Sequence, residues 1–385
     1  MFKRVNCIPA LLVLSVLSAC GGGGSGTATA PAPVQSTPPP TQLSVAESVD
    51  AIVKPYMSAN SVSAATISVM KDGVVLYEHG YGFQDAAQTT ALPANALFRT
   101  ASLVKPVTAA AIQNLATQGK LALSDHAFCV GNNQPCWLPE TLLSASTDAR
   151  VKDITLRQLL GHQGGWDRTI SEDPASTEAK IRDALGKTVP VNREDIIRYV
   201  MAKPLDFTPG SRTAYSNMGY LLLGQVIELA SKTDLMQYLQ STIMLPIGVN
   251  TEDFKQAHTL LTQRDPREPN YLSTLMIPSA FTPGKIALAM DEGALAENWT
   301  ASGGAIATAH AMATFAANYR LPDGVALAGA RNDGFKDGDA PGTTSALRQL
   351  PSGITYAVYM NASVAFNIEQ GSFLKQLDAA IAASK

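Results

Sequence analysis

The chain has 385 residues, of which 46% are hydrophobic and 16% are charged, so it can bury a sizeable core in one large domain or two lobes. Its formal net charge of −3 and its pI near 6.0 provide no basic surface for nucleic acid, and this excludes nucleic acid as a partner. Beyond the N-terminus, no apolar run is long enough to span a bilayer.

The N-terminal segment carries the pattern of an export signal. Lys3 and Arg4 precede an apolar stretch over residues 8–17, and small residues then lead into Cys20. Leu-Ser-Ala before this cysteine resembles the bacterial lipobox, in which the thiol receives diacylglycerol and becomes the new N-terminus. A plain signal peptide with an incidental cysteine is the alternative. We therefore predict a lipoprotein signal peptide over residues 1–19 and lipidation of Cys20.

The next segment is expected to be a tether. Residues 21–43 are nearly all Gly, Ser, Thr, Ala and Pro, a composition that cannot bury a core. With Cys20 it forms a predicted linker over residues 20–43, which would hold an exported domain on the periplasmic side of a membrane. Gly21 carries no acidic retention signal, so the outer membrane is favoured over the inner one.

Two cysteines remain for the folded domain, predicted over residues 44–385. Cys129 and Cys136 are close in sequence and would lie in an oxidising compartment, which favours a local disulfide over two free buried thiols. No CxxC or HExxH pattern and no clustered histidines occur, so we expect no metal site and no cofactor.

Hydrophobic periodicity gives the predicted elements in chain order. They are a helix over 44–58, strands over 64–70 and 74–83, helices over about 102–119, 218–231 and 310–319, strands over 343–350 and 354–360, and a helix over about 371–384. Strands thus lie near both ends and helices fill the middle. This order predicts an α+β fold, in which an antiparallel sheet flanked by helices carries an inserted, mostly helical lobe over about 120–300. The cleft between them is the expected place for chemistry.

A serine hydroxyl becomes a good nucleophile when a neighbouring base takes its proton, and Ser and Lys three residues apart share one face of a helix. Three pairs have this spacing: Ser68/Lys71, Ser102/Lys105 and Ser372/Lys375. The first lies in a predicted strand, where such residues point to opposite faces. The third opens the last helix with no further reactive group near it, so Ser102/Lys105 is the candidate.

The surroundings of Ser102 support this choice. Pro106 fits a helix only in its first turn, and it therefore places the helix start beside Ser102. The serine oxygen then lies near the positive end of the helix dipole. Apolar neighbours would favour a neutral amine at Lys105.

Two later segments complete a pattern. Tyr215-Ser-Asn217 follows a turn and leads into the helix over 218–231, and Lys336-Asp-Gly338 precedes the strand over 343–350. Together with Ser102-Leu-Val-Lys105 they resemble the superfamily of class C β-lactamases, D,D-peptidases (penicillin-binding proteins) and serine esterases. The stretches 154–165 and 302–308 also resemble that family, and the resemblance covers roughly residues 45–384. It implies a β-lactamase/transpeptidase-like fold.

The resemblance also implies roles for the residues of the motifs. Ser102 would attack an acyl carbonyl and form an acyl-enzyme, and Lys105 and Tyr215 would move the proton. Asn217 would orient the amide or ester side of the substrate. The backbone N–H groups of Ser102 and Asp339 would form an oxyanion hole next to Gly338.

Lys336-Asp-Gly338 departs from the family pattern, which has Lys-Thr-Gly or His-x-Gly. A carboxylate of Asp337 facing the pocket would pair with Lys336 and repel an anionic substrate. This predicts weak β-lactamase or carboxypeptidase activity and a better fit for neutral esters or amine-bearing amides. The alternative is that Asp337 points away from the pocket.

The function predicted is hydrolysis of a small-molecule or peptidoglycan-like acyl substrate by a serine esterase or a D-amino-acid peptidase or amidase. The alternatives are a β-lactamase and a non-catalytic cell-wall-binding lipoprotein that kept the fold. His162 is expected to be structural rather than a base, because a lysine and a tyrosine are available. Trp166, Asp167 and Arg168 could line the pocket mouth or cap their loop, and they are not counted as site residues.

Overall fold

A computed structural model of the chain describes residues 42–324 and 333–384. The predicted signal peptide, Cys20 and nearly all of the predicted linker lie outside the described residues. In the part of the chain described, no helix is both long and apolar enough to cross a bilayer.

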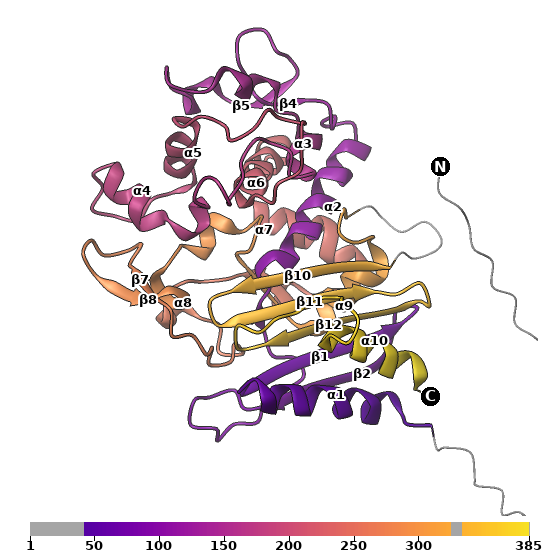
Figure 1. Cartoon of the computed structure of the whole chain (residues 1–385). Helices are drawn as coiled ribbons and strands as arrows, with labels where there is room; N and C mark the ends of the chain where they lie inside the picture. The colour runs from indigo at the N-terminus through magenta and orange to yellow at the C-terminus, as the bar shows by residue number, and fades with distance from the viewer. Residues whose placement is uncertain (1–41, 325–332, 385) are drawn as a thin grey trace, which may run out of the picture. The chain divides into compact units, whose positions relative to one another are not determined.

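Both ends of the folded domain contribute to one antiparallel sheet, with strand order β10-β11-β12-β1-β2 (Figure 1). The strands are β1 (Ala64–Lys71), β2 (Val74–Gly82), β10 (Gly334–Ala340), β11 (Thr343–Gln349) and β12 (Ile354–Met360). β1 pairs with its hairpin partner β2 and with β12 from the other end of the chain. The predicted antiparallel sheet is confirmed.

The alternation of side chains gives this sheet two buried faces. On β12, Tyr356 and Val358 pack into one apolar cluster, whereas Ala357 and Tyr359 pack into the other. The first cluster lies under two helices at opposite ends of the domain, α1 (Val45–Ala59) and α10 (Phe373–Ala383). Helix α9 (Ala309–Asn318) packs on the other face, with Met312 and Phe315 in the second cluster.

The helix termini follow local sequence signals. Ser44 caps α1 in a capping box with Glu47, and Ser372 caps α10 by accepting the N–H of Lys375. The predicted helices at both ends are therefore confirmed, with bounds that shift by one or two residues.

The inserted lobe is built around α2 (Val104–Thr117) and α6 (Asn217–Ser231), which pack against each other. Its other helices are α3 (Leu156–Leu160), α4 (Glu178–Ala184), α5 (Arg193–Met201), α7 (Leu235–Tyr238) and α8 (Ala289–Glu292). The lobe also holds short strands in small sheets: β4 (His126–Phe128), β5 (Cys136–Leu138), β7 (Met276–Pro278) and β8 (Ile286–Leu288). Most of these elements are short, so the lobe is less helical than the sequence suggested.

A second sheet of three short strands connects the lobe to the main sheet region. It has the order β3 (Phe98–Arg99), β9 (Ala305–Ala307) and β6 (Phe254–Gln256). Cys129 and Cys136 are joined by a disulfide next to the β4/β5 pair. Among the described residues, no cluster of three or more metal-ligating side chains occurs.

Candidate active site

Ser102 lies in a single 3-10 turn, Ala101–Leu103, that leads directly into α2 at Val104. Pro106 is in the first turn of α2, where its missing N–H breaks no helical hydrogen bond, as the sequence predicted. Ala101, the residue before the serine, has a φ of 44°, in the left-handed region that disfavours a side chain. Strain of this kind persists where surrounding contacts enforce it, so the serine is held in a defined position.

The Lys105 side chain is almost completely buried, with 1% of its surface exposed. Its Nζ lies 3.1 Å from Ser102 Oγ, 2.7 Å from Asn217 Oδ1 and 2.5 Å from the backbone oxygen of Ser302. Burial, followed by the charge of Lys336, lowers the pKa of Lys105 well below its usual value. Because the oxygens of Asn217 and Ser302 can only accept, a neutral amine donates its two hydrogens to them and turns its lone pair toward Ser102. The geometry suits an amine that removes the hydroxyl proton.

Tyr215 lies on the opposite side of the serine, with its Oη 2.6 Å from Ser102 Oγ. Burial raises the pKa of Tyr215 to about 12, so at neutral pH the phenol keeps its proton and can donate it. The ring of His162 packs against the phenol with 4.6 Å between centroids, and its Nδ1 accepts the N–H of Ser216 at 3.2 Å. The structure brings the three residues predicted to be catalytic within hydrogen-bonding distance, across one groove.

His162 has the surroundings of a structural residue. Burial lowers the pKa of His162 to about 4, so the ring is neutral at pH 7. Within the described part of the chain its hydrogen bond is to the backbone of Ser216, and its ring contacts are with Tyr215 and Tyr220. These contacts favour the predicted structural role, and they indicate that His162 holds Tyr215 in place.

Asn217 is the first residue of α6, whose N-cap is Ser216. Its Nδ2 donates to Asp173 Oδ2 at 2.7 Å, and this fixes the amide so that Oδ1 faces Lys105. The second carboxylate oxygen of Asp173 accepts the N–H of Ala175. Oδ1 and one N–H of Asn217 are therefore used inside the protein, and the contact of its second N–H with a substrate stays a prediction.

Strand β10 forms the edge of the groove beside the serine. A Cβ placed on Gly338 would lie 2.4 Å from Ser345 Oγ, 2.5 Å from the oxygen of Thr100 and 3.1 Å from the backbone nitrogen of Ser102. No side chain fits in that space, so a glycine is required for the strand to approach the nucleophile. The predicted position of Gly338 beside Ser102 has a steric explanation.

Lys336 and Asp337 lie on opposite faces of β10. Lys336 shares the face of Gly338, and its Nζ lies 5.5 Å from the centroid of the Tyr215 ring. Asp337 and Asp339 point to the other face, where they line a separate pocket with Phe366. The Asp337 carboxylate still reaches around the strand edge, and its Oδ1 accepts from Lys336 Nζ at 2.9 Å. Thus the expected ion pair with Lys336 is present, but Asp337 does not face the catalytic groove.

The other two Ser-x-x-Lys pairs have ordinary roles. Ser68 lies in β1 and donates to Glu78, and Ser372 caps α10. These roles agree with the prediction that neither pair is catalytic.

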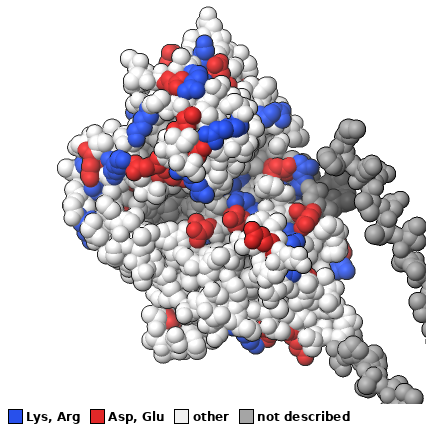
Figure 2. All heavy atoms as spheres, viewed as in Figure 1, with Lys and Arg blue, Asp and Glu red and all other residues white. Residues whose placement is uncertain are grey.

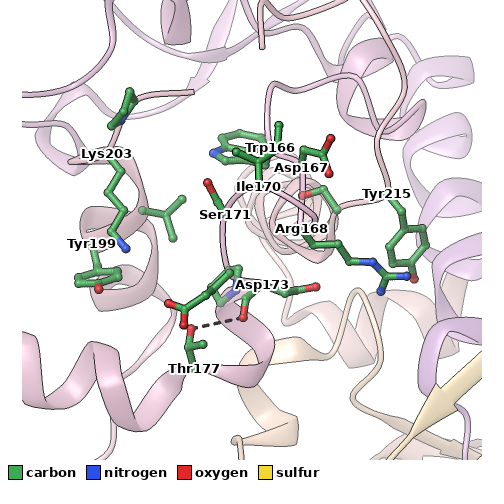
Figure 3. Close-up of a pocket in the computed structure, with 15 residues that line it drawn as sticks. Trp166, Asp167, Arg168, Ile170, Ser171, Asp173, Thr177, Tyr199, Lys203 and Tyr215 are labelled. Atoms are coloured by element: carbon green, nitrogen blue, oxygen red, sulfur yellow. Dashed lines mark hydrogen bonds between the residues drawn. The ribbon is translucent and has the colours of Figure 1, made fainter. Parts of the chain in front are cut away.

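A pocket of about 290 Å³ opens beside Tyr215, between the loop of residues 166–177 and the end of α5. Figure 3 shows Arg168 and Tyr215 at one end of it and Lys203 and Tyr199 at the other. Figure 2 shows a hollow in the visible face of the molecule, with acidic and basic side chains around its rim. Trp166, Asp167 and Arg168 line the pocket, and the Asp167 carboxylate also caps the loop by accepting from the N–H and hydroxyl of Thr169, so both alternatives left open for these residues are present.

The sequence did not indicate that Asp173 belongs to the site. Asp173 resembles any aspartate that caps a short turn, and its partner Asn217 is distant in sequence. The Asp-Pro pair at residues 173–174 is a turn signal, but it contains no information about a contact with a catalytic amide.

Comparison with known proteins shows the family to which the chain belongs. The family model described as Beta-lactamase matches residues 49–367. The chain is 27% identical over 212 residues to "Protein flp" of Staphylococcus aureus strain MW2, an alignment that covers 55% of this chain and 39% of the relative. The chain thus spans well under half the length of that curated relative.

Solved structures share the fold. D-alanine carboxypeptidase AmpC from Burkholderia cenocepacia superimposes with a TM-score of 0.60 at 16% identity, covering 88% of this chain and 98% of the other. D-amino acid amidase from Ochrobactrum anthropi SV3, complexed with L-phenylalanine, gives a TM-score of 0.60 at 17% identity and the same coverage. Because the family model matches most of this chain, the chain belongs to the beta-lactamase family.

Proposed function

We propose that this protein is a serine hydrolase that forms an acyl-enzyme on Ser102. One observation carries the proposal: the Ser102 hydroxyl lies 3.1 Å from a buried amine of lowered pKa and 2.6 Å from a phenol that keeps its proton. The beta-lactamase family consists of serine hydrolases, which supports the same conclusion.

In this mechanism Lys105 takes the proton as Ser102 attacks the acyl carbonyl, and Tyr215 delivers a proton to the leaving group. Water then attacks the acyl-enzyme with the same groups acting in reverse. General acid–base help of this kind typically contributes about 10²- to 10⁴-fold in rate. The N–H groups of Ser102 and Asp339 are proposed as the oxyanion hole, because Gly338 brings β10 against the serine.

The substrate class follows from the β10 side of the groove. Lys336 is paired with Asp337, so its charge is partly neutralised before any substrate arrives. We therefore propose esters or amides without a carboxylate at this end as substrates, rather than β-lactams or D-alanyl-D-alanine peptides. Hydrolysis of a cephalosporin as fast as that of p-nitrophenyl esters would refute this preference.

The decisive experiment is labelling of the full chain with a fluorescent fluorophosphonate. Wild-type protein should be labelled, and Ser102→Ala should lose both the label and ester hydrolysis. Ser372→Ala is the matched control, because it removes the serine of another Ser-x-x-Lys pair and should keep full labelling while losing only a helix cap, worth about 1 kcal/mol.

The rival function, a non-catalytic cell-wall binder, predicts a different result. It would give no covalent adduct in wild-type protein and no difference between wild type and Ser102→Ala. Binding to purified peptidoglycan that survives Ser102→Ala, without any labelling, would favour this rival.

We also propose that Cys20 carries a lipid that anchors the domain. The support is the Leu-Ser-Ala-Cys20 pattern followed by a polar linker. Cys20→Ala should move the protein from the membrane fraction to the soluble periplasmic fraction and abolish incorporation of labelled palmitate.

A further inference from the structure

We propose that the pocket beside Tyr215 binds a carboxylate-bearing group on the acyl side of the substrate, and that Arg168 recognises this group. The inference rests on the proposed function, because it names the substrate class of the same site. It concerns the lobe side of the groove, whereas the preference derived from Lys336 and Asp337 concerns the β10 side.

The first support is the position of Arg168. Its Cζ lies 4.8 Å from the centroid of the Tyr215 ring, and its side chain is exposed. Figure 3 shows the guanidinium of Arg168 beside the phenol of Tyr215, whose Oη contacts Ser102 Oγ. An anion bound there would meet a planar donor that suits a carboxylate through two parallel hydrogen bonds.

The second support is the distribution of partners among the charged residues of the pocket. Each acidic residue of the wall already has a partner; the pairs are Asp167–Arg212, Glu172–Lys180 and Asp173–Asn217. By contrast, neither Arg168 nor Lys203 has a carboxylate within ion-pair distance among the described residues. Arg168 and Lys203 thus feel carboxylates only at longer range, from Asp339 and Glu172 respectively, and an anionic ligand in the pocket would supply a direct partner.

The third support is the size and lining of the pocket. About 290 Å³ accommodates a short chain of a few carbons, and Trp166, Ile170 and Val200 provide an apolar wall for it. The acyl part of a substrate stays bonded to Ser102 through both half-reactions, whereas the leaving group departs after the first. A walled pocket can hold the acyl part throughout, so we assign the carboxylate to that part.

The test compares two esters of similar shape, 4-nitrophenyl hydrogen glutarate and 4-nitrophenyl valerate, hydrolysed by full-length protein. Wild type should prefer the anionic ester in kcat/KM. Arg168→Gln should reduce that preference, measured as the ratio of the two kcat/KM values, by at least about tenfold, because a charged hydrogen bond is lost only with the anion. Lys203→Gln should reduce the preference less, since it lies at the far end of the pocket.

Lys120→Gln removes an equal charge from an exposed position after α2 and serves as the control, with no change in the preference expected. A wild-type enzyme without preference for the glutarate ester, or an Arg168→Gln variant with an unchanged ratio, overturns the inference. In either case Ser102-dependent hydrolysis would persist, so the proposed function would stand. Hydrolysis that survives Ser102→Ala would instead overturn the proposed function.

A binding measurement tests the pocket without catalysis. Calorimetry on Ser102→Ala protein should detect monomethyl glutarate and give at least about tenfold weaker binding of dimethyl glutarate, which lacks the charge. Equal affinity for the two, or equal affinity of the Ser102→Ala and Ser102→Ala/Arg168→Gln proteins for monomethyl glutarate, would contradict the inference even if no hydrolysis is found.

Discussion

The two walls beside Ser102 are built in different ways. On one side is β10, a regular strand whose alternation puts Lys336 and Gly338 toward the nucleophile. On the other side is the irregular loop of residues 166–177, which is held by side-chain contacts such as the one between Asp173 and Asn217. The regular wall supplies the close backbone approach that acyl transfer needs. The irregular wall carries Arg168, and we assign substrate selection to it.

The largest effect is expected on the strand wall. Gly338→Ala would push β10 away from Thr100 and Ser102, because the added Cβ would overlap both the Thr100 oxygen and Ser345. We expect kcat/KM for a neutral ester to fall by about 10²- to 10³-fold, the usual cost of a lost oxyanion donor. Gly161→Ala is the control, since its Cβ would come no closer than 3.5 Å to any atom. Near-normal activity of Gly338→Ala would mean that catalysis does not need the close approach of β10 to Ser102.

His162, beneath Tyr215, should make stability depend on pH. Its pKa is about 4 in the folded protein and near 6.5 in an unfolded chain, so between these values the unfolded state binds more protons. The contribution of neutral His162 to the free energy of unfolding is present above pH 6.5. It falls by up to about 3 kcal/mol as the pH falls toward 4. Urea unfolding at pH 7 and pH 4.5 measures it.

The matched variant is His162→Asn, because asparagine tolerates the φ of 55° found at this position. It should remove this part of the pH dependence, although the protein becomes less stable at pH 7. The same pH dependence in both proteins would show that another group is responsible.

On the loop wall, Asp173→Ala should free the Asn217 amide to rotate. Lys105 then loses a fixed acceptor, and we expect kcat to fall by about tenfold, which corresponds to a hydrogen bond to a charged group. Asp234→Ala removes a comparable N-cap carboxylate, from α7, and should leave kcat unchanged. If the two variants behave alike, the loop wall contributes only to folding.

The smallest effect is a shift of the pH–rate profile by residues of the strand wall. The charge of Lys336 lowers the pKa of Lys105 and that of Asp337 raises it. Lys336→Gln should therefore move the acidic limb of kcat/KM for a neutral ester to higher pH, and Asp337→Asn should move it to lower pH. Shifts in the same direction in both variants would be incompatible with Lys105 as the base.

The sequence predicted the catalytic groups better than either wall. Pro106 marks the start of the helix that carries Ser102 and Lys105, and the apolar residues of that helix have helical spacing, so the position of both residues could be predicted. Strand β10 was not predicted as an element, because Lys336-Asp-Gly338-Asp reads as a turn and lacks apolar alternation. The position of Asp173 depends on a contact between segments distant in sequence, and local patterns carry no information about it.

The φ of Ala101 shows a similar limit. A glycine would have signalled a left-handed residue before the nucleophile, but an alanine does not. That conformation is imposed by tertiary packing, which single-residue propensities cannot anticipate.

The pairing of β1 with β12 has a consequence for synthesis. Ala65 of β1 pairs with Met360 of β12. The edge of β1 that pairs with β12 therefore has no partner strand until almost the whole chain has left the ribosome. Ser102 is made early, yet Gly338, its steric neighbour, arrives more than two hundred residues later. A nascent chain therefore carries the nucleophile without its surroundings, and we expect it to be inert toward acyl compounds until the last strands have been added.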